Sequence, residues 1–139
     1  MTDVATRGSS ELDSRYAHIL LYSDNSEVRE AVRFAVGNSI GTREVRWVET
    51  ATHDAAIAQI DERSFDVVIL DGEAAKVGGM GISRQVKHEL YNPPPVLLLV
   101  GRADDAWLAT WSEADAAVAH PLDAFEVRAA VEEILALDD

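Results

Sequence analysis

Val-Val-Ile-Leu-Asp-Gly, at residues 67–72, is a short apolar run that ends in an acid and a glycine. A second run, Ile19 to Tyr22, is followed closely by Asp24. Continuous apolar runs of this length are typical of strands that are covered on both faces, as in a parallel sheet. Such sheets carry their sites beyond the carboxyl ends of the strands, so Asp24 and Asp71 are expected to face one crevice. Two carboxylates in that position suit a divalent cation and a phosphoryl group.

The composition argues against several classes of function. The chain has 139 residues and no cysteine, so disulfides and thiolate metal sites are excluded. With 25 acidic against 12 basic residues, the net charge is −13, which opposes direct binding to nucleic acid. No apolar run approaches the roughly 20 residues that span a bilayer, and Met1–Ser14 has no signal-peptide core. We therefore expect a cytoplasmic protein without membrane insertion.

Apolar runs alternate with amphipathic segments from His18 onward. The predicted strands are 19–22, 45–48, 67–70, 96–100 and 116–119, and the predicted helices are 26–36, 52–62, 80–90, 104 or 105 to 111, and a last helix that starts at Asp123. This alternation predicts an α/β fold with a doubly wound, five-stranded parallel sheet in the flavodoxin-like order 2-1-3-4-5. Residues 1–15 are expected to form a flexible leader and residues 16–139 a single domain.

Taken together, these features resemble the receiver domain of two-component response regulators, from about Ala17 to Leu137. Five parts of the sequence carry the resemblance. They are residues 19–24 together with Arg29, residues 65–71, Gly79, residues 95–101 and residues 114–121. It implies a non-enzymatic protein of phosphorelay signal transduction, with a histidine kinase upstream. Because the chain ends soon after the last predicted helix, we expect the signal to pass to a separate output protein.

The resemblance also implies roles for individual residues. Asp71 would be the phosphoacceptor, and Mg²⁺ would be held by Asp24, Asp71 and the backbone carbonyl of Glu73. The chemistry is sound, because Mg²⁺ prefers oxygen ligands and phosphoryl transfer depends on positioning and charge neutralisation. The alternative for either aspartate is that a strand-end Asp merely caps the following turn.

Four residues depart from the family pattern. Ser23 stands where the family has a second acid, so Mg²⁺ binding should be weak. Val100 replaces a threonine or serine and cannot donate a hydrogen bond to a phosphoryl oxygen. His120 replaces a lysine with a group whose reference pKa is about 6.5. Ala117 replaces an aromatic residue, so the sequence indicates an atypical receiver.

Other functions stay open. The chain could be a phosphorylation-independent pseudo-receiver that acts as a protein-binding adaptor, and an enzyme such as a flavin carrier or an aspartyl phosphatase is a less favoured class. Gly101 would leave a phosphodonor room to approach, although it could simply serve a turn. For Glu73, the side chain could assist the metal, but solvation is the favoured role of a loop glutamate.

Three apolar residues, Trp107, Leu108 and Trp111, follow helical spacing. Exposed together, large aromatic side chains would dominate an interface with a partner or a second copy in a homodimer. The alternative is that they cover the last strand as ordinary core. Full burial of Trp107 and Trp111 would exclude the interface.

Overall fold

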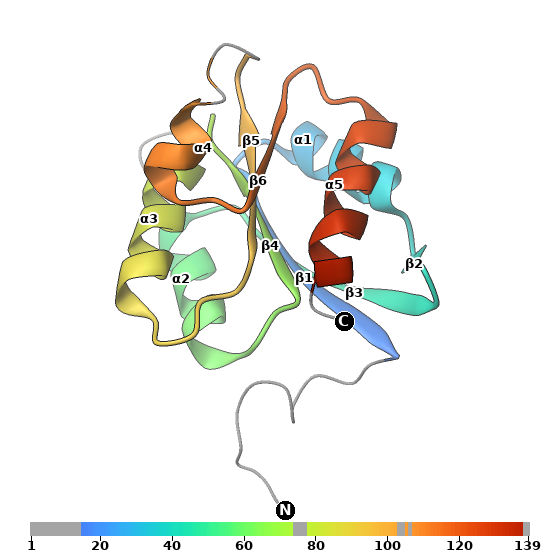
Figure 1. The fold of residues 1–139 in the computed structure, drawn as a ribbon, viewed down its shortest axis with the longest axis horizontal. Coiled ribbons are helices and arrows are strands. Elements are labelled where there is room, and N and C mark those ends of the chain that lie inside the picture. The colour runs from blue at the N-terminus through green and yellow to red at the C-terminus, as the bar shows by residue number, and fades with distance from the viewer. Residues whose placement is uncertain (1–14, 74–77, 103–104, 106, 138–139) are drawn as a thin grey trace, which may run out of the picture.

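The computed structural model describes residues 15–73, 78–102, 105 and 107–137 (Figure 1). A central sheet runs through the molecule in the order β2-β3-β1-β4-β5-β6. Its strands are β1 (Tyr16–Tyr22), β2 (Ser39–Ile40), β3 (Arg43–Thr50), β4 (Val67–Asp71), β5 (Val96–Val100) and β6 (Ala116–Ala119). All neighbouring strands pair in parallel except β2 and β3, which are antiparallel.

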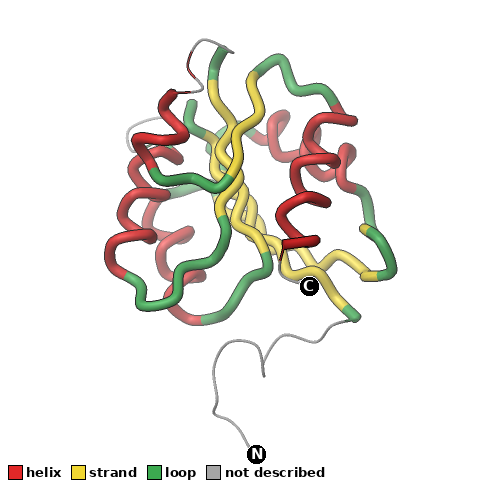
Figure 2. Tube along the Cα trace, in the orientation of Figure 1, coloured by secondary structure: helices red, strands yellow, loops and turns green. Residues whose placement is uncertain are grey.

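In the described part of the chain, helices cover both faces of the sheet, as Figure 2 shows. They are α1 (Ser26–Val36), α2 (His53–Glu62), α3 (Gly79–Glu89), α4 (Trp107–Ser112) and α5 (Ala124–Leu137). In Figure 1, α1 and α5 lie on one face, and α2, α3 and α4 lie on the other. The carboxyl ends of the parallel strands lie at the top of that view.

Two apolar clusters account for this layered arrangement. Alternate residues of a strand point to opposite faces, so Ile69 joins the cluster beneath α1 and α5 while Leu70 joins the cluster beneath α2 and α3. Every residue of β4 and β5 is buried, as expected for central strands of a parallel sheet. The register pairs Tyr22 with Leu70 and Asp71 with Leu99, which brings these strand ends level with one another.

The predicted strand order is confirmed, but the predicted count of five strands is wrong. The additional strand, β2, pairs only Ser39 with Glu44 and Ile40 with Arg43, across a turn in which Gly41 has a φ of 60°. A two-residue strand leaves too short a pattern to recognise in the sequence. β3 is also longer than predicted, because the residues at both of its ends are polar and lie outside the apolar run.

Side-chain caps fix the starts of three helices, and the sequence predicts those at Thr52 and Asp123. The side chains of Asn25 and Thr52 accept hydrogen bonds from the backbone N–H groups of Glu27 and Ala55. Asp123 accepts from the backbone of Phe125 and Glu126 at the start of α5. α4 is described from Trp107, and its predicted start at Asp104 or Asp105 adjoins residues 103, 104 and 106, which lie outside the described residues.

Candidate functional site

Asp71 ends β4 with its side chain buried and both carboxylate oxygens hydrogen-bonded. The residue is only 2% exposed. Its Oδ2 accepts a hydrogen bond of 2.7 Å from the Oγ of Ser23, and its Oδ1 accepts one of 2.9 Å from the backbone N–H of Glu73. A carboxylate held through both oxygens has a fixed orientation. A fixed orientation positions a reactive group for attack on a second molecule.

Ser23 is the residue that connects β1 to this carboxylate. It is completely buried, its backbone N–H donates to the carbonyl of Thr50, and its own carbonyl accepts from Arg29. Its Oγ also accepts from the backbone N–H of Asn25 at 3.1 Å. Every polar group of Ser23 is therefore used, and its hydroxyl is fixed toward Asp71.

Asp24 and Asp71 lie near a common neighbour, the phenol of Tyr22. Burial raises the pKa of Tyr22 above its usual value, and the negative charges of Asp24 and Asp71 raise it further. The charges of both strand-end carboxylates therefore act on the phenol of Tyr22. Tyr22 itself was not singled out from the sequence, because nothing distinguishes it there from the other apolar residues of β1.

His120 lies beside Asp71 without a hydrogen bond to it. Its Nε2 is 3.8 Å from Asp71 Oδ1, and this buried nitrogen has no hydrogen-bond partner among the described residues. The peptide bond between His120 and Pro121 is cis. The backbone N–H of His120 donates to the carbonyl of Val100, which holds the residue at the end of β6.

Glu73 occupies a position that the sequence did not predict. Its carboxylate oxygens lie 2.8 and 2.9 Å from the point where a Cβ on Gly101 would stand. Although the residue as a whole is exposed, its carboxylate therefore fills part of the space that Gly101 leaves beside the site. Its exposure agrees with the favoured role in solvation, and its carboxylate also lies close to Gly101.

Val100 and Ala117 both pack in the apolar cluster beneath α2 and α3. Val100 is 2% exposed and belongs to the cluster beneath α2 and α3, which Ala117 and Ala119 also contact. In the register of β5 with β6, Val100 pairs with Ala119. Val100 of β5 therefore offers no hydroxyl, and Ala117 of β6 offers no aromatic ring.

Trp107 and Trp111 are exposed by 63% and 49%, so the alternative that they form ordinary core is wrong. The guanidinium carbon of Arg84 lies 4.8 Å from the centre of the Trp111 ring, and Arg84 also donates to the carbonyl of Trp111. α3 thus holds the end of α4 while its aromatic side chains face outward.

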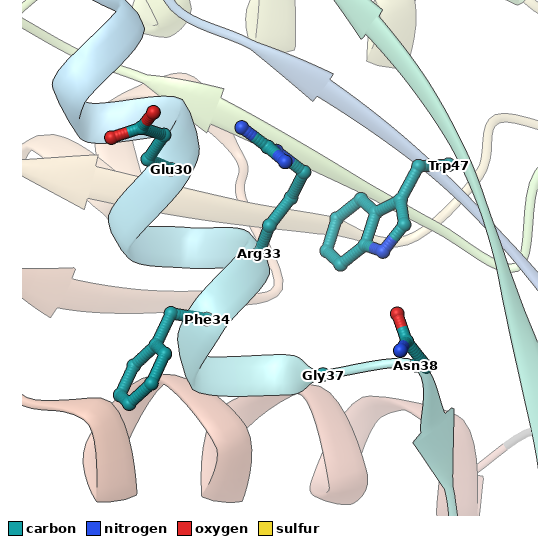
Figure 3. A pocket seen from close by; sticks show the side chains of 6 residues that line it. All are labelled: Glu30, Arg33, Phe34, Gly37, Asn38 and Trp47. Carbon is teal, nitrogen blue, oxygen red and sulfur yellow. The ribbon is translucent and has the colours of Figure 1, made fainter.

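An open groove lies along α1 and β3, away from these residues. Its lining residues, drawn in Figure 3, are Glu30, Arg33, Phe34, Gly37, Asn38 and Trp47. None of the candidate site residues contributes to it. In the part of the chain that the structure describes, no three histidine, cysteine or acidic side chains cluster as a metal site, and no helix is long and apolar enough to cross a membrane.

Comparison with known proteins identifies the family. No family model matches the chain. Proteins from two strains of Mycobacterium tuberculosis, CDC 1551 / Oshkosh and H37Rv, are each 50% identical over 107 residues, which cover 76% of this chain and 80% of the relative. Both carry the name uncharacterized response regulatory protein. The chain belongs to the response regulator family of two-component signalling.

Solved structures agree on the fold. The chemotaxis response regulator CheY4 of Vibrio cholerae is 20% identical with a TM-score of 0.72, over 86% of this chain and 99% of that one. A response regulator from Chloroflexus aurantiacus is 24% identical with a TM-score of 0.73, over 86% of this chain and 98% of that one. The fold is that of a response regulator receiver domain.

Proposed function

We propose that this chain is an atypical receiver in which Asp71 accepts a phosphoryl group and the signal passes on through protein–protein contact. The observation that carries the proposal is the fixed carboxylate of Asp71, which is buried, held by Ser23 and Glu73, and flanked by His120. An aspartate that only capped a turn would need none of the groups that other strands bring to it.

The proposed reaction needs little covalent chemistry from the protein. A carboxylate oxygen of Asp71 attacks phosphorus, the bond from phosphorus to the donor breaks, and the product is an aspartyl phosphate. His120, when protonated, would place a positive charge beside the phosphoryl oxygens. The buried Nε2 without a partner supports that role, because such a group gains most from a new hydrogen bond.

Asp24, Asp71 and the backbone carbonyl of Glu73 form a donor set that fits a weakly bound Mg²⁺. These are oxygen ligands, and Mg²⁺ in proteins often has only one or two carboxylates and several waters. When bound, the ion supplies charge neutralisation during phosphoryl transfer. Ser23 contributes no negative charge and already occupies one oxygen of Asp71, so we assign the site a low affinity.

Intact-mass spectrometry tests the proposal. The wild type and Asp71→Asn are incubated with Mg²⁺ and each of two phosphodonors, acetyl phosphate and phosphoramidate. The wild type is expected to gain one phosphoryl group and Asp71→Asn none. Equal phosphorylation of both proteins would contradict the assignment of Asp71.

A second candidate is a phosphorylation-independent adaptor. It is favoured by the apolar surroundings of Val100 and Ala117, because a phosphoryl group on Asp71 would find no hydroxyl at the end of β5 with which to shift a conformational equilibrium. Binding of a partner protein before and after phosphorylation separates the two candidates. A gain in affinity of more than about tenfold, absent in Asp71→Asn, would show a working switch.

A further inference from the structure

The outer edge of β3, on the side away from β1, is open along most of its length. β2 is two residues long and pairs only with the first two residues of β3. Beyond that pairing, the backbone N–H of Val45 donates to the carbonyl of Asn38. In the part of the chain that the structure describes, no strand lies beside the remainder of β3 on that side. The remainder of β3, up to Thr50, is therefore a free strand edge.

Trp47 and Glu49 carry the backbone groups that face this free edge. Successive residues of a strand direct their N–H and C=O groups to opposite sides. Val45 bonds outward, whereas the carbonyl of Thr50 accepts from the N–H of Ser23, on the side of β1. Trp47 and Glu49 share the outward direction of Val45. A strand edge with such groups can accept an added strand.

The groove between α1 and β3 lies directly beside this edge. In Figure 3 the indole of Trp47 turns from β3 toward α1. Phe34, which is 84% exposed, and Glu30 lie one helical turn apart on α1 and line the same groove. The carboxylate of Glu30 has no ion pair with any described residue, whereas Arg33 is paired with Glu49 at 2.9 Å. The groove therefore offers two aromatic side chains and a negative charge without a described partner.

We propose that the free edge of β3 binds an extended, basic segment of a partner protein, which adds as a strand in line with β2 and antiparallel to β3. The residue opposite Trp47 exchanges two backbone hydrogen bonds with it, and its side chain points to the same face of the sheet as the indole. A lysine or arginine at that position meets the carboxylate of Glu30 and the ring of Phe34. The residues before and after it point to the other face, beside the half-buried Val48, which favours apolar side chains there.

The charge of the molecule favours a basic segment over a second copy of this chain. The net charge is −13, which attracts a basic partner and opposes the close approach of two identical edges. Asp71 does not line the groove, so the proposed binding does not depend on phosphoryl transfer at that residue.

Hydrogen exchange measured by NMR, with and without a short synthetic peptide of alternating lysine and valine, tests the added strand. The peptide is expected to slow the exchange of the Trp47 and Glu49 amides by at least about tenfold. The amides of Arg46 and Val48, which face β1, are expected to change little.

Two matched peptides separate the backbone contacts from the charge. One has glutamate in place of lysine. The other carries methyl groups on the backbone nitrogens of its lysines, so it cannot donate hydrogen bonds to β3. Both are expected to bind at least about tenfold more weakly than the lysine–valine peptide.

Two variants test the side-chain contacts with the lysine–valine peptide. Glu30→Gln is expected to weaken binding about threefold, and Phe34→Ala about threefold to tenfold. Both side chains are exposed, so these variants should fold like the wild type. Glu133→Gln and Phe125→Ala, at exposed positions on α5, are the matched controls and are expected to bind like the wild type.

Unchanged exchange at Trp47 and Glu49 with the peptide in excess, or equal binding of the methylated peptide, would overturn the added strand. Equal binding of the glutamate peptide would overturn the basic partner, and wild-type binding in both Glu30→Gln and Phe34→Ala would overturn the role of the groove. Slow exchange of the two amides without peptide would also overturn the proposal. If that exchange becomes faster on dilution, a second copy covers the edge; if it does not, another part of the chain covers it.

Discussion

Ser23 determines how the carboxylate of Asp71 is held and how much negative charge surrounds it. Its hydroxyl donates to Asp71 across two strands, in a position where a second acid would repel that carboxylate. Serine stands here where the family pattern has an acid. A neutral hydrogen bond to Asp71 therefore takes the place of a negatively charged ligand for a cation. We therefore expect the site to be stable without metal and to bind Mg²⁺ weakly.

Ser23→Asp is expected to raise Mg²⁺ affinity by about tenfold or more, because it adds a third carboxylate to those of Asp24 and Asp71. Without Mg²⁺ the same variant should be less stable, since the new carboxylate is buried beside Asp71. Amide NMR titration measures the affinity. Ser23→Asn, which has a similar shape and no charge, is the control. Equal affinities for the two variants would contradict the assignment of the metal ligands.

The pKa of Tyr22 depends on the charges of the site. Its pKa is raised above 10.0 by burial, by Asp24 and by Asp71, so the folded state holds the phenolic proton more tightly than the unfolded state. The resulting stability is present below pH 10.0 and is lost as the pH rises through the folded pKa. Asp71→Asn should lower the pKa of Tyr22, because it removes one of the two negative charges. The increase that burial causes should remain.

Phenolate absorbance, taken as the difference between each protein and its Tyr22→Phe variant, isolates the titration of Tyr22. An unchanged Tyr22 titration in Asp71→Asn would show that the two side chains do not interact.

At the scale of the elements, an ion pair at the opposite end of the strands joins β3 to the start of β4. Arg43 lies 3.0 Å from Asp66 Oδ1 and donates twice to the carbonyl of Tyr16, while Asp66 Oδ2 accepts from the backbone of His18. Both charged side chains are largely buried. Removal of one partner would leave the other desolvated and unpaired.

Arg43→Met is therefore expected to lower the free energy of unfolding by about 2 kcal/mol. Chemical denaturation measures this loss. Arg46→Met, which removes an exposed arginine from the same strand, should cost clearly less. A loss no larger than that of the control would contradict the role of the pair in joining the strands.

Several elements could be predicted because their residues carry strong patterns. The apolar runs of β1, β4 and β5, the caps at Thr52 and Asp123, and the acid at the end of β4 all follow from local sequence. The strand β2 could not be predicted, since two residues form no pattern.

Parts of the site were also beyond sequence reasoning. The positions of the Ser23 hydroxyl and the Glu73 carboxylate depend on side-chain conformations and on contacts between strands that are far apart in the chain. The environment of Tyr22 likewise depends on tertiary packing, which no spacing of residues reveals.

At the scale of the whole molecule, the exposed aromatic residues of α4 are a second feature, distinct from the site of Asp71. α4 is fixed at its end by α3, because Ser83 donates to the carbonyl of Ser112 and Lys87 pairs with Asp115 at 2.7 Å. Trp107 and Trp111 project outward from this anchored helix. Exposed tryptophans on a rigid support are favourable anchors for a partner or for a second copy.

The double variant Trp107→Ala/Trp111→Ala is expected to weaken self-association or partner binding by at least about tenfold. Its free energy of unfolding should change by no more than about 1 kcal/mol, because neither side chain is buried. Analytical ultracentrifugation and chemical denaturation measure the two quantities. Phe125→Ala, an exposed aromatic on α5, is the control. Binding that depends on Phe125 and not on the tryptophans would refute the assigned surface.

The most direct test of the central claim is to locate the phosphoryl group chemically. An aspartyl phosphate is reduced by borohydride to homoserine, whereas an unmodified carboxylate is not. After treatment with phosphodonor and Mg²⁺, followed by borohydride, tandem mass spectrometry of the peptide that contains Asp71 is expected to show homoserine at that position. Homoserine at another aspartate, with Asp71 unchanged, would contradict the account.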